Sequence, residues 1–115
     1  MFLTSLTRYG RREQMKYEVK FPNHSIEKKF DKALSILPRT IQDKIIKAVE
    51  KLSNNPRPYG EKPFKKLKVP FQFYQFTAQY RVRIGNHRVL YDVDDKKKVV
   101  WILRLKKRSE RSYKS

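Results

Sequence analysis

The sequence lacks cysteine, has only two histidines, His24 and His87, and contains no long run of apolar residues. Without cysteine there can be no disulfide, thiolate nucleophile or cysteine-ligated zinc, and two histidines are too few for an ordinary zinc site. The basic residues near the N-terminus follow a short apolar patch instead of preceding it, which does not indicate a secretion signal. These absences predict a cytoplasmic protein with no metal, no cofactor and no membrane association.

Acidic residues are scarce as well, since 11 Asp and Glu stand against 29 Lys and Arg, a formal charge of +18 on 115 residues. Self-repulsion of this size is usually tolerated where the partner is a polyanion. Nucleic acid is the favoured partner class and an acidic protein comes next. A membrane surface is less favoured, because no basic amphipathic helix with a broad apolar face is present.

Seven Phe and seven Tyr residues supply enough large side chains to close one core, and the length allows one domain. Met15 opens the first segment with a regular pattern. We therefore expect residues 1–14 to be a flexible or mis-started N-terminal extension and residues 15–115 to form a single domain.

Hydrophobic periodicity predicts a strand followed by two helices. Residues 16–21 alternate charged and apolar side chains, which is typical of a short strand with one buried face. Residues 24–36 carry apolar side chains at helical spacing, as do residues 41–52, and a proline separates the two segments. Thr40 with Asp43 three residues later resembles a capping box at the start of the second helix.

Asparagines and prolines predict a loop over residues 53–63. The next segment, FKKLKVPFQFYQFTAQ, mixes cations with aromatics and leaves open a strand or an irregular crossing segment. Gly85-Asn86 predicts a tight hairpin turn. Three strands are expected in the second half of the chain, over residues 79–84, 87–93 and 99–105.

The segment YRVRIGNHRVLY places arginines opposite one another. A two-residue turn at Gly85-Asn86 sets Arg83 against Arg88 and Arg81 beside them, on the face away from the apolar set. Like charges directly opposite on a sheet are destabilising, so a bound phosphate would compensate, because guanidinium offers a planar fork of donors. The simpler interpretation is a solvated basic face. Lys106, Lys107 and Arg108 join this face if the tail KKRSERSYKS folds back along the sheet, whereas an isolated basic tail is usually disordered.

From about Met15, the chain resembles the RelE family of bacterial and archaeal toxins, within the RelE/ParE superfamily. The resemblance rests on LSNNPRP, on the KKL segment, on YRVRIGNHRVLYDV and on WILRLKKRSERSYK. It implies an α+β fold in which an N-terminal strand and a helical hairpin pack with a small, mainly antiparallel sheet. It also implies an endoribonuclease that cleaves mRNA in the ribosomal A site without metal, held inactive by a cognate antitoxin.

The resemblance also implies roles for single residues. Arg81 and Arg83 match the two basic strand residues after the family's tyrosine, and Arg88 matches the arginine that binds the scissile phosphate. Arg108 and Tyr113 match the C-terminal arginine and tyrosine implicated in cleavage. The best-known members carry lysines in place of Arg81 and Arg83. The spacing from Arg108 to Tyr113 is one residue longer than in some relatives, so Lys107 or Arg111 could replace Arg108.

Cleavage needs a base for the 2′-OH, positive charge on the phosphorane-like transition state, and a proton or positive charge for the leaving 5′-oxygen. Arginine supplies only the last two, because its pKa is too high for a general base. A tyrosine, a lysine or His87 remains, and a lone histidine on the core face is more often structural. Tyr113 is the preferred base, or it stacks on a nucleobase. Further RNA-binding residues are expected at Lys65, Lys66, Lys68, Lys106, Lys107 and Arg111.

Two other functions fit the same sequence. A ParE-like relative would inhibit DNA gyrase, a protein target, although that branch generally lacks a nuclease set such as Arg108 and Tyr113. A non-catalytic basic protein would bind nucleic acid without cutting it, and it explains the charge equally well.

Overall fold

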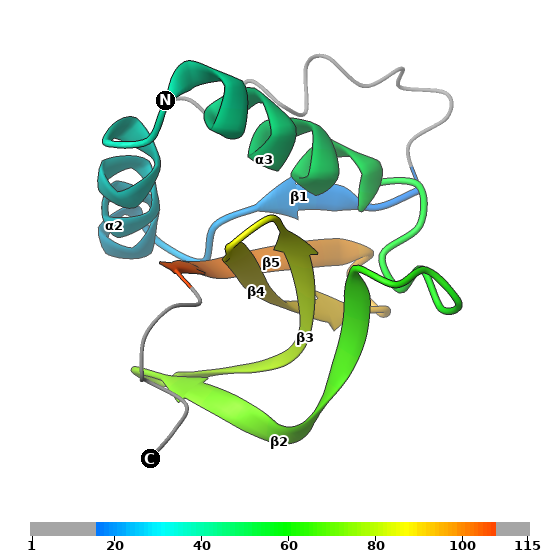
Figure 1. Cartoon of the computed structure of the whole chain (residues 1–115). Coiled ribbons are helices and arrows are strands. Elements are labelled where there is room, and N and C mark those ends of the chain that lie inside the picture. Colours follow the sequence, from blue (N-terminus) through cyan, green and yellow to red (C-terminus); the bar gives the residue numbers. More distant parts are fainter. Residues whose placement is uncertain (1–15, 108–115) are drawn as a thin grey trace.

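The structure of the protein is a computed structural model, and it describes residues 16–107. Two consecutive helices lie over one face of a five-stranded sheet (Figure 1). The N-terminal extension predicted for residues 1–14 lies outside the described residues. The elements in chain order are β1 (Glu18–Lys20), α2 (His24–Ser35), α3 (Arg39–Lys51), β2 (Phe64–Phe73), β3 (Phe76–Ile84), β4 (His87–Asp94) and β5 (Val99–Lys107).

Helix α2 begins at a side-chain cap. The Ile26 backbone N–H donates to Asn23 Oδ1 at 2.9 Å, which satisfies one of the amides that a helix start leaves without a partner. Ile26, Phe30 and Leu34 follow at four-residue spacing and are all buried. The helix predicted from that spacing is confirmed, and it ends at Ser35.

The predicted capping box of α3 is wrong. The helix begins at Arg39 directly after Pro38, and no side chain caps it. Pro38 already has φ −58°, so the chain turns into the helix at once and its carbonyl accepts from the Ile41 and Gln42 amides at 3.0 Å. Thr40 thus lies inside the helix and is exposed.

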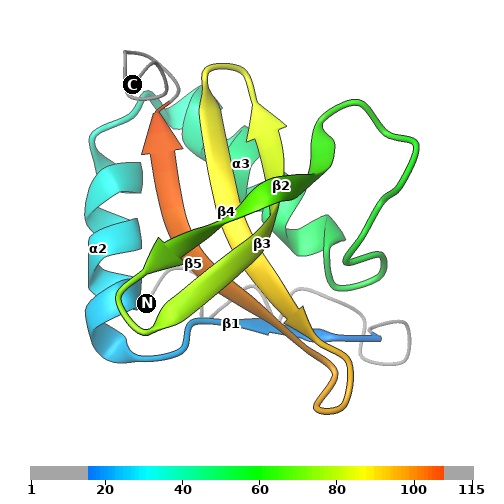
Figure 2. The ribbon, with the colours of Figure 1, turned by 90° about the horizontal axis from the view of Figure 1, so that it is seen from below.

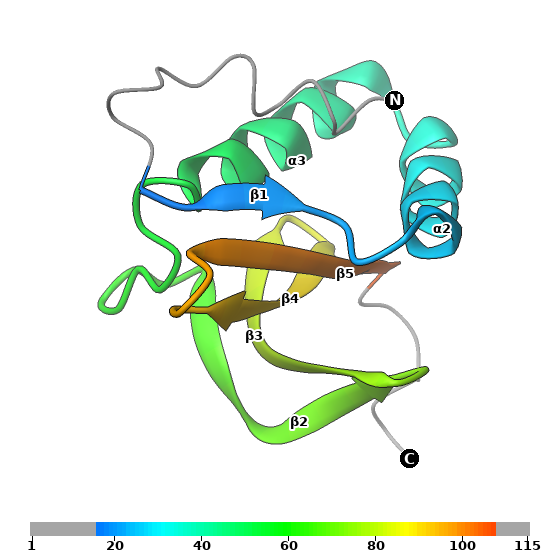
Figure 3. The same ribbon diagram turned by 180° about the vertical axis from the view of Figure 1, so that it is seen from behind.

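The sheet has the strand order β1-β5-β4-β3-β2. Only the pairing of β1 with β5 is parallel, and the other three are antiparallel, so the predicted α+β architecture with a mainly antiparallel sheet is confirmed. Seen from behind, β1 lies next to β5 on the same side of the molecule as α3 (Figure 3).

The segment that the sequence left open is a long, interrupted strand and a turn. Strand β2 pairs with β3 at both ends, but the register shifts between Lys66 and Phe71. A two-residue turn at Tyr74 and Gln75 then leads into β3. Seen from below, the bent β2–β3 hairpin crosses in front of β4 and β5 (Figure 2). We call residues 71–76 the hairpin tip.

The bend divides the apolar residues into two clusters. The main core lies between the helices and the sheet and includes Phe30, Ile45 and Tyr91. A smaller cluster on the other face contains Ala78, Leu90 and Leu103, and the rings of the hairpin tip pack against it. The tip therefore covers part of a sheet face that would otherwise be open.

The loop between α3 and β2 is fixed to the sheet by hydrogen bonds. The buried Tyr91 hydroxyl donates to the Pro56 carbonyl at 2.6 Å. Arg57 donates from Nε to the Tyr80 hydroxyl at 3.0 Å and forms an ion pair with Asp95 at 2.7 Å. Tyr17 donates to the same carboxylate at 2.7 Å. One network thus connects the start of β1 with this loop and with the β4–β5 turn.

Candidate functional site

The turn between β3 and β4 fixes the register of the arginines. Gly85 has φ +61°, a left-handed conformation that suits a two-residue hairpin turn. The pairing is the predicted one, with Arg83 opposite Arg88 and Ile84 opposite His87. Val82 and Val89 are buried on the helix side, so the two arginines lie on the opposite face.

The flanking strands add further cations to that face. Lys65 of β2 pairs with Arg81, and Lys106 of β5 pairs with Arg88. Arg104 pairs with Leu90, which belongs to the smaller apolar cluster. Since cross-strand partners share a face, six cations from four strands lie on the same side of the sheet as this cluster. We call them the basic face, and they are Lys65, Arg81, Arg83, Arg88, Arg104 and Lys106.

Two of these arginines differ in their contacts. Arg81 donates from Nη1 to the Pro63 carbonyl at 2.8 Å, and the same carbonyl accepts from the Arg83 amide at 2.9 Å. Arg81 therefore fastens the loop before β2 to β3. Arg88 is half-buried, and its Nε is buried with no hydrogen-bond partner among the described residues. A buried donor without an acceptor is costly, and an anion bound by this guanidinium could supply the acceptor.

Three predicted RNA-binding lysines lie away from the basic face. Lys66 pairs with Tyr80 and Lys107 pairs with His87, so both side chains start from the helix side of the sheet. Lys68 is exposed in the stretch of β2 where the register with β3 is broken. The remaining predicted residues, Arg108, Arg111 and Tyr113, lie outside the described part of the chain.

His87 is partly buried beside Ile84 and Lys107. Burial lowers the pKa of the imidazole, and the nearby Lys107 charge lowers it further. Both effects favour the neutral imidazole, and His87 lies on the face opposite the arginines. This position suits packing better than contact with a phosphate on the basic face.

One carboxylate shares the sheet face with the arginines. Asp92 pairs with Trp101 toward the far end of β4 and lines a pocket of about 260 Å³ with Phe76 and Leu103. Burial raises the pKa of this carboxyl above its ordinary value, although the amide of Val93 opposes the shift. Between residues 16 and 107, no three His, Cys, Asp or Glu side chains gather closely enough to hold a metal ion.

Arg104 and the aromatic rings of the hairpin tip were not predicted from the sequence. Arg104 is a single cation in the apolar segment VVWILRL. The register of β5 against β4 is irregular near Leu90, so simple alternation does not show on which sheet face Arg104 lies. The unusual density of Phe and Tyr between residues 71 and 76 was the available signal. The position of these rings under β5 could not be predicted without the bend of β2.

These features describe a small α+β protein with six cations on one face of its sheet. Residues 23–112 match the family described as the ParE toxin of the type II toxin–antitoxin system parDE. The chain therefore belongs to the RelE/ParE superfamily and is a toxin of a toxin–antitoxin system, which confirms the resemblance seen in the sequence.

Solved structures agree with this assignment. The chain is 31% identical to the RelE chain of the archaeal RelE–RelB complex from Pyrococcus horikoshii, with a TM-score of 0.62 over 84% of this chain and 100% of that one. For the toxin–antitoxin complex RelBE2 of Mycobacterium tuberculosis, the identity is 25% and the TM-score 0.58, over 84% and 95% of the two chains.

The YoeB dimer of Staphylococcus aureus, at 22% identity and a TM-score of 0.54 over 79% of this chain and 95% of that one, shares the fold. A comparison with curated protein sequences gives no match. Neither helix in residues 16–107 is long and apolar enough to cross a membrane.

Proposed function

We propose that this toxin is an endoribonuclease that cleaves mRNA in the ribosomal A site without a metal ion, and that a cognate antitoxin holds it inactive in the cytoplasm. The observation that carries the proposal is the pairing of Arg83 with Arg88 on the exposed face of the sheet. Identity of 31% to a RelE chain supports the ribonuclease branch of the superfamily.

In this mechanism, Arg83 and Arg88 bind the non-bridging oxygens of the scissile phosphate. The 2′-oxygen attacks phosphorus and loses its proton to a base, while the bond from phosphorus to the 5′-oxygen breaks. The products are a 2′,3′-cyclic phosphate and a 5′-hydroxyl, which takes up one proton. The two guanidiniums stabilise the extra negative charge of the phosphorane-like transition state, because the strand pairing holds the two arginines opposite each other before it forms.

The remaining roles fall to the C-terminal segment. Arg108 stabilises the charge on the leaving oxygen, and Tyr113 serves as the base or stacks on a nucleobase. Arg81 keeps a share in phosphate binding, but its bond to the Pro63 carbonyl gives it a second task, the placement of β2 against β3.

The antitoxin is expected to be acidic or helical where it covers the basic face, because a bound polypeptide must neutralise these cations. In the complexes from P. horikoshii and M. tuberculosis, the RelE-type chains are bound to RelB antitoxins. A RelB-like protein is therefore the proposed partner of this chain.

Growth arrest and RNA mapping test the proposal together. We would induce wild type, Arg88→Ala and the control Arg39→Ala, whose exposed side chain lies on α3, and map 5′-hydroxyl ends in cellular mRNA. We expect wild type and Arg39→Ala to stop growth and to cut at fixed codon positions within translated frames. Arg88→Ala should do neither while remaining folded.

The match to the ParE toxin family favours inhibition of DNA gyrase as the second candidate function. The same experiment separates the two functions. Growth arrest with intact mRNA and relaxed plasmid DNA would support the gyrase target and would contradict the ribonuclease. Salt-sensitive RNA binding without arrest or cleavage would identify a non-catalytic nucleic-acid-binding protein.

A further inference from the structure

The hairpin tip forms a cluster of aromatic rings and cations under β5. Phe71 and Phe73 stack with ring centroids 6.2 Å apart, and the Phe73 and Tyr74 rings are 4.8 Å apart. The Arg104 guanidinium carbon lies 5.2 Å from the Phe73 ring centroid. The Lys106 ammonium lies 5.3 Å from that of Phe71. Both cations belong to the basic face, so the tip is continuous with it.

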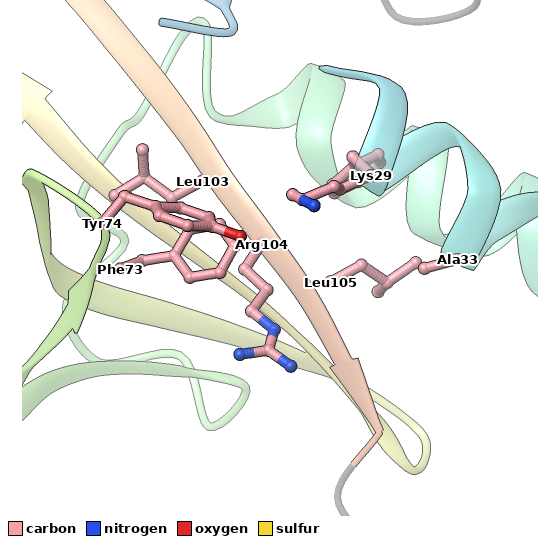
Figure 4. A pocket seen from close by; sticks show the side chains of 8 residues that line it. Lys29, Ala33, Phe73, Tyr74, Leu103, Arg104 and Leu105 are labelled. Atoms are coloured by element: carbon pink, nitrogen blue, oxygen red, sulfur yellow. The ribbon is translucent and has the colours of Figure 1, made fainter. Parts of the chain in front are cut away.

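Beside this cluster is a pocket of about 370 Å³ (Figure 4). Phe73 and Tyr74 form one wall, α2 forms the opposite wall through Lys29 and Ala33, and β5 forms the floor. The Lys29 ammonium lies 5.7 Å from the Tyr74 ring centroid. None of the eight lining residues is acidic. We call this space the tip pocket.

Tyr74 occupies its position at an energetic cost. Its φ of 60° lies in the left-handed region, which a bulky side chain rarely adopts. The residue is also 62% exposed, so burial offers little compensation for the strain. Glycine or asparagine would fit this turn with less strain. Strained residues of this kind are found at binding sites, where the ligand interaction justifies them.

We propose that the tip pocket binds a nucleobase of the single-stranded RNA whose backbone lies on the basic face. The base stacks on the exposed ring of Tyr74, beside Phe73, and the neighbouring phosphate contacts Arg104 or Lys29. This inference rests on the proposed RNA substrate and adds a contact away from the Arg83–Arg88 pair. An RNA strand fits better than a peptide, because aromatic faces combined with cations and no carboxylate suit a base and its phosphate.

Tyr74→Asn separates binding from packing, because asparagine tolerates the left-handed backbone. We would measure the affinity of purified toxin for a fluorescent oligoadenylate and for an abasic phosphodiester strand of equal length, at several salt concentrations. Loss of one stacked base lowers affinity about 5- to 100-fold. We expect this loss for oligoadenylate only, with an unchanged salt slope because no cation is removed. The melting temperature should stay equal or rise.

Tyr59→Asn is the matched control, since it removes another tyrosine that is 67% exposed, in the loop before β2. It should bind both strands like wild type. Equal oligoadenylate affinity of Tyr74→Asn and wild type would overturn the tip pocket while leaving RNA cleavage by wild type intact. The tip pocket would also be overturned if Tyr74→Asn bound a RelB-type peptide more weakly but bound RNA like wild type. That result would identify a protein-docking surface. If wild type binds no RNA, the proposed function and the pocket fail together.

Discussion

Arg83 and Arg88 stand directly opposite each other across the β3–β4 hairpin, and Lys106 continues the row on β5. Three cations thus occupy adjacent positions across three strands. Cross-strand like charges oppose folding, and a neutral residue at any of the three positions would relieve the repulsion. The proposed binding of a phosphate explains why three cations stand together here at some expense of stability.

Removal of one charge from this row should stabilise the fold. We expect Arg83→Gln to raise the free energy of unfolding by about 0.2–1 kcal/mol, because the repulsion by Arg88 is lost. The gain should shrink at high salt, which screens exposed charges. Urea denaturation at two salt concentrations measures it. Arg39→Gln, on the exposed side of α3, is the control, and an equal gain there would show that net charge alone is responsible.

The hydrogen bond from Tyr91 to the Pro56 carbonyl should contribute strongly to the stability of the fold. Tyr91→Phe leaves that buried carbonyl without its partner, so we expect a loss of about 1–3 kcal/mol in unfolding free energy. Thermal denaturation measures the loss. Tyr59→Phe should have little effect, because its side chain is largely exposed. A loss below the error of the experiment would show that water replaces the hydroxyl.

Asp95 should make stability depend on pH in the acid range. The hydrogen bond from Tyr17, followed by that from Arg57, lowers the pKa of this carboxyl in the folded state. Its contribution is therefore complete above the unfolded pKa of about 3.9, and it is lost as pH falls through the folded value. We expect the stability difference between wild type and Asp95→Asn to vanish at low pH. A difference that is independent of pH would contradict this assignment.

The two neighbouring lysines at the start of β2 should differ in their effect on RNA binding. Lys65 lies on the basic face, whereas Lys66 starts from the other side of the strand. Lys65→Gln should weaken binding to all sequences and reduce the salt slope by about one. Lys66→Gln should leave both unchanged. Equal effects of the two substitutions would mean that overall charge, and not the basic face, determines affinity.

The sequence predicts most of the elements because their signals are local. Alternation defined β1, four-residue spacing defined α2, and Gly85-Asn86 set the register that brings Arg83 to Arg88. The capping box was wrong because the helix already begins after Pro38, whose carbonyl accepts from the Ile41 and Gln42 amides.

The site was only partly predictable because the rest depends on tertiary structure. A break in register after Lys66 bends β2, and this bend carries Phe73 and Tyr74 under β5 to meet Arg104. Residues 64–79 contain no periodic pattern that predicts the bend. Likewise, no local signal shows that Arg81 binds the Pro63 carbonyl, since that contact joins a loop to a strand 18 residues away.

The most direct test of the central claim uses translating ribosomes and purified toxin. Wild type, Arg83→Gln and Arg88→Gln would be added to ribosomes stalled at a known codon, and mRNA cleavage would be followed in the presence of a metal chelator. We expect wild type to cut within the A-site codon. Both variants should fold normally but cleave at least a hundredfold more slowly, on the order of 3 kcal/mol of lost transition-state stabilisation. Cleavage at the wild-type rate by either variant, or intact mRNA with wild type, would contradict this claim.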